Sequence, residues 1–269
     1  MSVSLAYHTD LALRRLEGAE VMRHSGCVVV RSPHNPTFWW GNFLLMPRAP
    51  QPGDLARWTR AFETKFPQAG WRTFGINTAD GEAGAAGAFE EAGFEVHRDT
   101  VLTAGRTQAP RTFNRDAQVR RLEGPADWQA ALELRLAVNA ADPEPLEPAD
   151  YRAFAARKLA AYRAAQDAGA GAFWGAFDAD GRMLSGLGLF DAGQGVARYQ
   201  SVETHPEARS RGLAGTLVHT AGEWAREALG TRTLVIVADP AYHAQALYER
   251  VGFRPGEVQL GFQRRPAEG

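Results

Sequence analysis

The chain has 269 residues, of which 45% are hydrophobic and 23% are charged, a composition typical of a globular protein large enough for two domains. Its 30 basic and 31 acidic side chains give a formal net charge of −1, so charge gives no reason to expect nucleic acid or a membrane surface as a partner. The single cysteine, Cys27, rules out an internal disulfide and a zinc site built from paired thiolates, and we expect no metal.

Neither a secretion signal nor a membrane span is expected. His8, Asp10 and Arg14 fall where a secretion signal would be apolar. No stretch approaches the roughly 18 apolar residues that a spanning helix needs. Together with the lone cysteine, these features favour a reducing, cytoplasmic setting.

Hydrophobic periodicity and turn residues predict alternating helices and strands along the chain. In the first half we expect helices at 11–22, 54–66 and 82–91, and strands at 28–31, 38–46, 73–76 and 96–103. In the second half we expect strands at 119–122, 173–177, 183–190, 196–202 and 233–237 and a closing strand, with helices opening at Pro125, spanning 148–168, following Gly212 and spanning 244–251. This order predicts the α/β class, with a central mixed sheet flanked by helices.

The two halves resemble each other. An Ala-Asp pair, an aromatic-Glu pair and a Gly-Phe pair follow one another at 79–94 and again at 238–253, so that Phe89 corresponds to Tyr248. The same alignment pairs Pro47 with Pro206 and Gly53 with Gly212. We therefore predict a duplicated unit, with a truncated first domain at 1–110, a second domain at 116–269 and a polar join between them.

The segment from Arg209 to Gly215 follows a strand and opens a helix. Backbone N–H groups at a helix N-terminus are unpaired and favour a phosphate group, and Gly212 permits close approach of the backbone. A solvated turn between a strand and a helix fits the same letters, because short glycine motifs also occur by chance. We call this segment the cradle; its residues are Arg209, Ser210, Arg211, Gly212, Leu213, Ala214 and Gly215.

The stretch 202–214, followed by 244–253, resembles the GNAT superfamily of N-acetyltransferases, in a tandem form with a degenerate N-terminal copy. The resemblance implies that the cradle holds the pyrophosphate of acetyl-CoA and that the backbone of Val202 and Thr204 pairs with the pantetheine arm. It also implies that Tyr248 protonates the departing thiolate. His243 stands where many members have an asparagine that contacts the cofactor.

The catalytic candidates are Tyr248, Glu203 and His205. Transfer of an acetyl group to an amine needs a neutral amine and a proton for the sulfur. Glu203 and His205 lie at the end of the strand that would face the acetyl group, and strand alternation places them on one face, where they could act through one water. Each also fits a solvated residue at a strand end, and Tyr248 also fits an aromatic packed against the sheet.

The first copy is predicted to be inactive. Where the cradle has Arg209-Ser210-Arg211, the first half has Pro50-Gln51-Pro52, and proline has no N–H to offer a phosphate. Phe89 also lacks the hydroxyl of Tyr248. The leading hypothesis is an acetyl-CoA-dependent N-acetyltransferase acting on a small-molecule or peptide amine, as a possible homodimer. The alternative is a non-catalytic module that binds or senses acyl-CoA.

Overall fold

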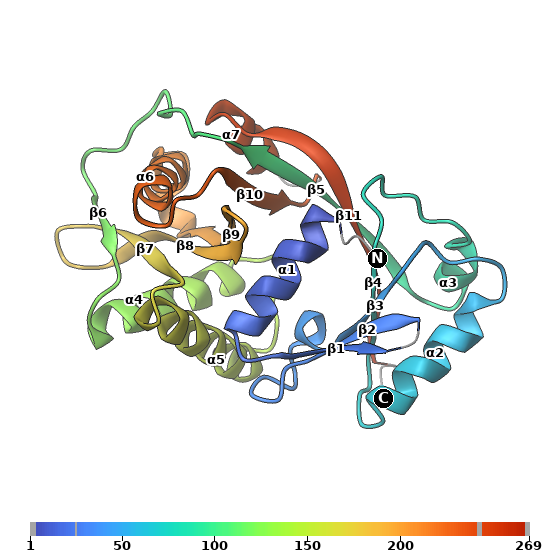
Figure 1. Cartoon of the computed structure of the whole chain (residues 1–269). Coiled ribbons are helices and arrows are strands. Elements are labelled where there is room, and N and C mark those ends of the chain that lie inside the picture. Colours follow the sequence, from blue (N-terminus) through green and yellow to red (C-terminus); the bar gives the residue numbers. More distant parts are fainter. Residues whose placement is uncertain (1–3, 25, 241–243, 267–269) are drawn as a thin grey trace. The chain divides into compact units, whose positions relative to one another are not determined.

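A computed structural model of the protein describes residues 4–24, 26–240 and 244–266 (Figure 1). These residues form two units. The first contains 4–24, 26–101, 237–240 and 256–266, and the second contains 102–236 and 244–255. The units differ from the predicted ranges 1–110 and 116–269, because residues 256–266 fold with the first half of the chain and 102–110 fold with the second.

The strands of the first unit lie in the order β1-β2-β3-β4-β11-β5. Strand β11 runs antiparallel to β4, with Leu260 opposite Ile76 and Phe262 opposite Phe74, and this pairing explains why the end of the chain belongs to the first unit. The elements of this unit are α1 (Leu5–Leu16), β1 (Glu20–His24), β2 (Cys27–Arg31), β3 (Phe43–Met46), α2 (Asp54–Lys65), β4 (Arg72–Ile76), α3 (Gly87–Glu91), β5 (Glu95–Ala104) and β11 (Arg254–Arg264).

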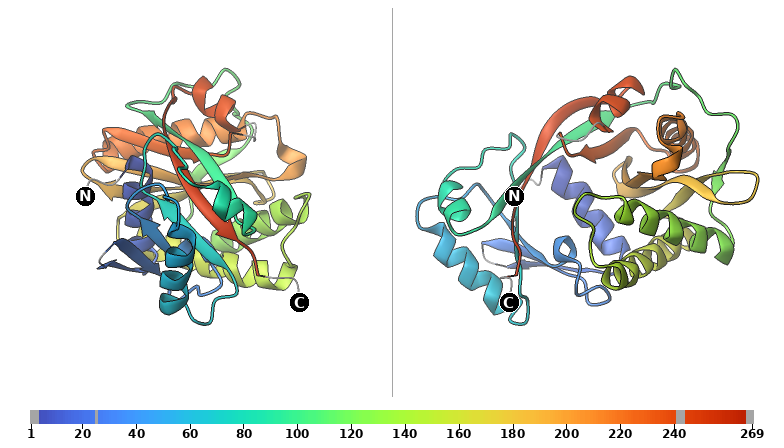
Figure 2. Two further views of the ribbon diagram at one scale, coloured as in Figure 1. Left: turned by 90° about the vertical axis from the view of Figure 1, so that its right-hand side faces the viewer. Right: turned by 180° about the vertical axis from the view of Figure 1, so that it is seen from behind.

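The strands of the second unit lie in the order β6-β7-β8-β9-β10, antiparallel except for the parallel pair β9 and β10. Helices α4 and α5 pack on one face of β7 to β9, and α6 packs on the other (Figure 2). The elements are β6 (Gln118–Arg121), α4 (Pro125–Ala140), α5 (Pro148–Asp167), β7 (Gly171–Phe177), β8 (Met183–Gly193), β9 (Val196–Thr204), α6 (Leu213–Ala228), β10 (Thr233–Ala238) and α7 (Ala244–Arg250), with a short 3₁₀ helix at Pro206–Ala208.

The predicted class is confirmed, since each unit holds a mixed sheet flanked by helices. The core of the first unit is rich in aromatic rings from α2, β4, α3 and β11. Both units also contain a strand, a helix and a second strand parallel to the first: β3, α2 and β4 in one, and β9, α6 and β10 in the other. This is the connectivity that a duplicated unit requires.

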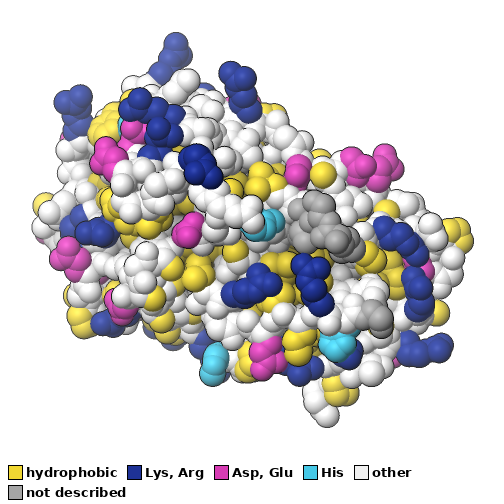
Figure 3. All heavy atoms as spheres, in the orientation of Figure 1, with side chains coloured by type: hydrophobic (Ala, Val, Ile, Leu, Met, Phe, Trp, Pro, Cys, Tyr) yellow, Lys and Arg dark blue, Asp and Glu magenta, His cyan; other side chains and the backbone are white. Residues whose placement is uncertain are grey.

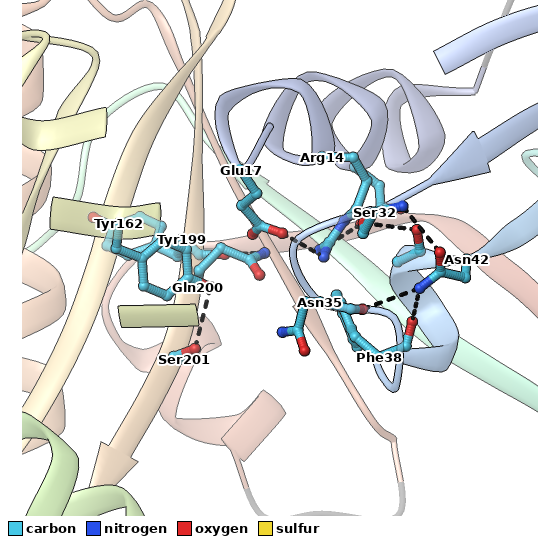
Figure 4. A network of polar contacts seen from close by, with 12 residues as sticks. Arg14, Glu17, Ser32, Asn35, Phe38, Asn42, Tyr162, Tyr199, Gln200 and Ser201 are labelled. Carbon is cyan, nitrogen blue, oxygen red and sulfur yellow. Dashed lines mark hydrogen bonds and ion pairs between the residues drawn. The ribbon is translucent and has the colours of Figure 1, made fainter. Parts of the chain in front are cut away.

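Part of the predicted strand at 38–46 is instead a 3₁₀ turn at Trp39–Gly41, with β3 beginning only at Phe43. Side chains hold this turn (Figure 4): the Asn42 amide donates to the carbonyl of Phe38 at 2.8 Å, and the Ser32 hydroxyl donates to the carbonyl of Gly41 at 2.8 Å. Local bonds of this kind give the backbone an alternative to the sheet ladder.

Two predicted helices of the first half also have different bounds. The helix expected at 82–91 is shorter in the structure, where only α3 at Gly87–Glu91 is helical. Gly81 and Gly84 adopt positive φ angles of 73° and 53° before it. The helix expected at 11–22 ends at Leu16, where Gly18 at φ 81° turns the chain into β1. Glycine adopts these left-handed conformations without strain, so both changes follow from its position.

On the face shown in Figure 3, Lys and Arg side chains are interspersed with Asp and Glu. On that face, basic and acidic side chains are not separated into two patches of opposite charge. Within the described residues, every helix is too short or too polar to span a bilayer.

Candidate active site

The cradle combines a left-handed turn with an open helix end. Ser210 and Gly212 have positive φ angles of 62° and 75°, and Gly212 is the N-cap of α6. Among the described residues, the backbone N–H groups from Ser210 to Gly215 have no hydrogen-bond acceptor, and the first turn of α6 holds no acidic residue. Arg209 and Arg211 are exposed beside them. This arrangement suits a phosphate group, because the N–H groups and the helix dipole both favour negative charge.

The segment from Arg106 to Asn114 supports the cradle from behind. The Asn114 amide donates to the carbonyl of Arg211 at 3.0 Å, and its backbone N–H donates to the Thr216 hydroxyl at 2.8 Å. A side chain at Gly212 would collide with the carbonyl of Thr112. Glycine is thus required at 212 by the protein's own backbone as well as by its positive φ, a requirement that the sequence alone had assigned to the ligand.

Strand β9 carries a β-bulge where the candidate residues begin. Gly188 lies opposite Gln200 and Gly186 lies opposite Glu203, so Ser201 and Val202 together face Leu187 of β8. Ser201 has a positive φ of 50°. A bulge adds one residue to a strand and so reverses the alternation of its side chains.

The reversal changes the helix that each side chain meets. Before the bulge, the Tyr199 hydroxyl donates to a carbonyl of α6 at 2.7 Å. After it, the Ser201 hydroxyl lies 3.4 Å from the Tyr162 hydroxyl of α5, and Glu203 faces α4. In a regular strand all three residues would share one face. The bulge therefore brings Glu203 to the side of the sheet that α4 and α5 cover.

Glu203 forms an ion pair with Arg135 of α4, with Arg135 Nη2 at 3.4 Å from Glu203 Oε1. The side chains are 7% and 17% exposed, respectively. Burial raises the pKa of Glu203 above its ordinary value, and the guanidinium opposes that rise. A carboxylate whose pKa is raised is a stronger proton acceptor than a solvated one.

His205 lies beyond the end of β9 and has different partners. Its Nδ1 accepts the N–H of Glu207 at 3.3 Å, and its Nε2 lies 2.6 Å from Arg182 Nη2. Burial and the charge of Arg182 lower the pKa of His205, so the ring is neutral. A neutral imidazole has one acceptor nitrogen, and N–H donors already face both of its nitrogens. The structure thus gives Glu203 and His205 separate surroundings.

His205 lines a groove of about 500 Å³ between α4 and the turn that joins β7 to β8. This turn joins the strands that the sequence predicts at 173–177 and 183–190, and in it the Asp178 N–H donates to the carbonyl of Arg182 at 3.0 Å. Ala130, Leu134 and Met183 contribute apolar walls.

Tyr248 lies on α7 and is 6% exposed, with its ring 6.3 Å from the ring of Phe253. Burial raises the pKa of its phenol above the ordinary value, so the hydroxyl keeps its proton at neutral pH. Within the described part of the chain, that hydroxyl has no hydrogen-bond partner. His243, the candidate for a side-chain contact with the cofactor, lies outside the described residues.

The pairing of β9 with β10 ends at Arg198, which lies opposite Val235. From Tyr199 to Thr204, the edge of β9 away from β8 has no strand partner among the residues that the structure describes. The backbone of Val202 and Thr204 lies on this stretch, as the predicted contact with an extended pantetheine arm requires. Over the described ranges, no group of three or more His, Cys, Asp or Glu side chains is placed to hold a metal ion.

The turn at the start of α2 is the segment that the sequence alignment pairs with the cradle. Gly53 caps α2 with φ 87°, close to the value at Gly212. Here, however, the carboxylate of Asp54 lies at the helix end and accepts the N–H of Gln51 at 2.9 Å. It also pairs with Arg48 at 2.8 Å and Arg57 at 2.6 Å. A side chain of the protein itself thus occupies the position of an anion.

Sequence reasoning did not identify Arg135, which has no motif of its own. The one available signal was a charged residue on the apolar face of a predicted helix, since Ala131 and Leu134 beside it are also buried. Such a residue needs a buried partner, but the sequence does not say which one.

Comparisons with known proteins agree with this geometry. The model of the acetyltransferase (GNAT) family matches residues 132–253. A GCN5-related N-acetyltransferase from Kribbella flavida is similar in fold, with a TM-score of 0.65 at 16% identity, covering 100% of this chain and 98% of that one. A functionally unknown conserved protein from Staphylococcus epidermidis ATCC 12228 has a TM-score of 0.70 at 13% identity, covering 91% and 93% of the two chains.

A tandem GNAT protein from the clavulanic acid biosynthesis pathway is also similar, with a TM-score of 0.52 at 17% identity, covering 90% of this chain and 83% of that one. No curated protein sequence matches the chain. At these identities the structures establish the fold, and the family model locates the domain. Residues 132–253 of the chain therefore carry a domain that matches the acetyltransferase (GNAT) family.

Proposed function

We propose that the second unit transfers the acetyl group of acetyl-CoA to the amine of a small-molecule or peptide acceptor. The observation that carries the proposal is the row of backbone N–H groups from Ser210 to Gly215, which have no acceptor among the described residues and stand at the end of a 16-residue helix. This row would hold the pyrophosphate. The free edge of β9 at Val202 and Thr204 would align the pantetheine arm.

Glu203 and Tyr248 would perform the proton transfers. An amine attacks the thioester only when it is neutral, and Glu203 would accept the proton that the ammonium form loses. The new C–N bond forms as the C–S bond breaks, and the Tyr248 hydroxyl would donate its proton to the departing thiolate. The second proton that the nitrogen loses as the amide forms would restore the Tyr248 hydroxyl by way of solvent. Acetyl-CoA would supply the activated acetyl group, Glu203 would be the base, and Tyr248 would be the acid.

We assign no cofactor site to the first unit, whose turn at α2 would be a degenerate counterpart of the cradle. Pro50 and Pro52 lack N–H groups, and Asp54 places a carboxylate where a phosphate would have to approach. The negative charges of the Asp54 carboxylate and of a phosphate placed beside it would repel each other.

The experiment has two stages. Calorimetric titration with acetyl-CoA should show binding to the full-length protein, and a panel of primary amines should then release free thiol in the presence of acetyl-CoA. Absence of binding would overturn the proposal. Binding without turnover across the panel would instead support a module that only senses acyl-CoA.

A further inference from the structure

Arg135 of α4 is a buried charged residue of the second unit that the proposed mechanism does not use. It is 6% exposed, and its Nε and Nη1 atoms have no hydrogen-bond partner among the residues the structure describes. A guanidinium cannot lose its charge in a protein, so burying it is costly unless a partner compensates. Its one ion pair in the described structure is with Glu203.

The titratable groups around this pair come from two helices and one strand. Arg135 faces Glu203 from α4, and Tyr151 and Tyr162 approach the guanidinium from α5. From β8, Ser185 donates its hydroxyl to the carbonyl of Glu203 at 2.7 Å and adds no charge. Arg135 is therefore the single cation that acts on the Glu203 carboxyl among the described residues.

We propose that Arg135 is a positioning residue for acetyl transfer, whose guanidinium orients the Glu203 carboxylate and keeps it ionised to receive a proton from the acceptor amine. The inference rests on the proposed function for its catalytic consequence. Its electrostatic part, the dependence of Glu203 ionisation on Arg135, does not need turnover.

The geometry explains why an arginine is needed here. The bulge turns Glu203 toward α4, into surroundings where burial opposes its charge. With Arg135 replaced by a neutral residue, nothing would offset that burial, and the pKa of Glu203 would rise further. A larger fraction of Glu203 would then be protonated at neutral pH and unable to act as a base.

The test replaces Arg135 by Gln and follows Glu203 directly. Carboxyl ¹³C resonances of glutamate-labelled protein, with the Glu203 signal assigned from Glu203→Gln, report the titration of this group without substrate. We expect the midpoint to rise by about one pH unit or more in Arg135→Gln. The acidic limb of the pH profile of kcat/KM should move upward by the same amount.

Two further variants separate electrostatics from shape. Arg135→Lys keeps the charge, so its midpoint and acidic limb should stay closer to those of the wild type than those of Arg135→Gln. Arg152→Gln is the matched control, because it breaks an exposed Arg–Glu pair with Glu133 at 3.5 Å and should shift neither quantity. Should Arg135→Gln fail to fold, Arg135→Met takes its place, because it also removes the charge and fills similar space with an apolar side chain.

An unchanged Glu203 midpoint in both Arg135 variants would overturn the inference. A midpoint that rises while the acidic limb stays fixed would overturn the role of Arg135 in transfer. Wild-type protein that acetylates no amine would overturn the proposed function instead, and the resonance titration would still decide whether Arg135 controls Glu203.

Discussion

Helices α2 and α6 begin with the same backbone turn and end up with opposite electrostatics at their N-termini. Gly53 and Gly212 cap them at φ 87° and 75°, each after a strand and before a parallel partner strand. At α6 the N–H groups from Ser210 to Gly215 have no acceptor among the described residues, whereas at α2 the Asp54 carboxylate accepts the N–H of Gln51, which the sequence alignment pairs with Ser210. The turn alone therefore does not make an anion site; the side chains around it decide whether the site is open.

The second difference lies on the next helix of each unit, α3 with Phe89 and α7 with Tyr248. Phe89 and Tyr248 have the same backbone contact. The N–H of Phe94 donates to the carbonyl of Phe89 at 2.9 Å, and the N–H of Phe253 donates to the carbonyl of Tyr248 at 3.1 Å. Both aromatics are buried, at 1% and 6% exposure. Packing is thus satisfied with or without the hydroxyl, which leaves proton donation as the distinguishing property of Tyr248.

The largest expected effect comes from making the second site resemble the first at this position. Tyr248→Phe keeps the ring and removes the proton donor, so kcat should fall by about 10²–10⁴-fold while acetyl-CoA affinity stays unchanged. Thiol-release assays measure the rate, and calorimetry measures the affinity. Tyr7→Phe, which removes a buried hydroxyl from the first unit, serves as the control. Wild-type turnover by Tyr248→Phe would reduce Tyr248 to a packing residue.

The next effect concerns the two capping glycines. In Gly212→Ala the new methyl group would collide with the carbonyl of Thr112 and strain a positive φ, so the cradle would shift. We expect acetyl-CoA to bind at least about tenfold more weakly, equivalent to about 1.4 kcal/mol. Gly53→Ala is matched in φ but meets nothing within 4 Å, and it should leave binding unaffected. Equal losses of affinity in the two variants would contradict the assignment of the site to α6.

A smaller effect is expected when the internal anion of α2 is neutralised. Burial opposes the ionisation of Asp54, but the N–H of Gln51 and the charges of Arg48 and Arg57 together hold its pKa below the ordinary value. A carboxyl with a lowered pKa in the folded state stabilises the fold above its unfolded pKa, near 4, and loses that contribution as the pH falls further.

Asp54→Asn should accordingly lower the free energy of unfolding by about 1 kcal/mol at pH 7, and the difference from the wild type should close below about pH 4. Urea denaturation at the two pH values measures it. Glu63→Gln, at an exposed pair with Arg72, should have a smaller effect at both. A deficit that persists unchanged at low pH would mean that shape, not charge, is what Asp54 provides.

The smallest expected effect is none at all. Titration of the full-length protein should give one acetyl-CoA per chain, and Asp54→Ala should not create a second site, because Pro50 and Pro52 still lack N–H groups. A stoichiometry of two in either protein would show that the first unit retains a working cradle.

The sequence predicted those features that depend on neighbours along the chain. Helix α6 starts directly after Gly212, as its spacing indicated, and β7 and β8 lie where strands were predicted at 173–177 and 183–190. The bulge at Ser201 was not predictable, because nothing in the letters of β9 distinguishes an extra residue from a regular one. It reverses the face on which Glu203 lies, and so the partner of Glu203 could not be foreseen.

The site residues divide in the same way. Tyr248 and the cradle could be predicted as site residues because a motif places them at fixed spacing along the chain. Arg135 was missed because it meets Glu203 only after α4 has packed on the sheet. The placement of β11 beside β4 was missed for a similar reason, since strand order is set by pairing between distant segments.

The position of β11 has a consequence for how the protein is made. In the first unit this strand lies between β4 and β5, although most of the second unit separates it from both of them in the sequence. Domains generally fold from the N-terminus as they emerge. Here the sheet that is begun first would be completed last, leaving an edge of β4 unpaired until residues 254–264 appear. An exposed edge of this kind pairs readily with other chains, so the interval of translation between β5 and β11 is when this protein is most exposed to misassembly.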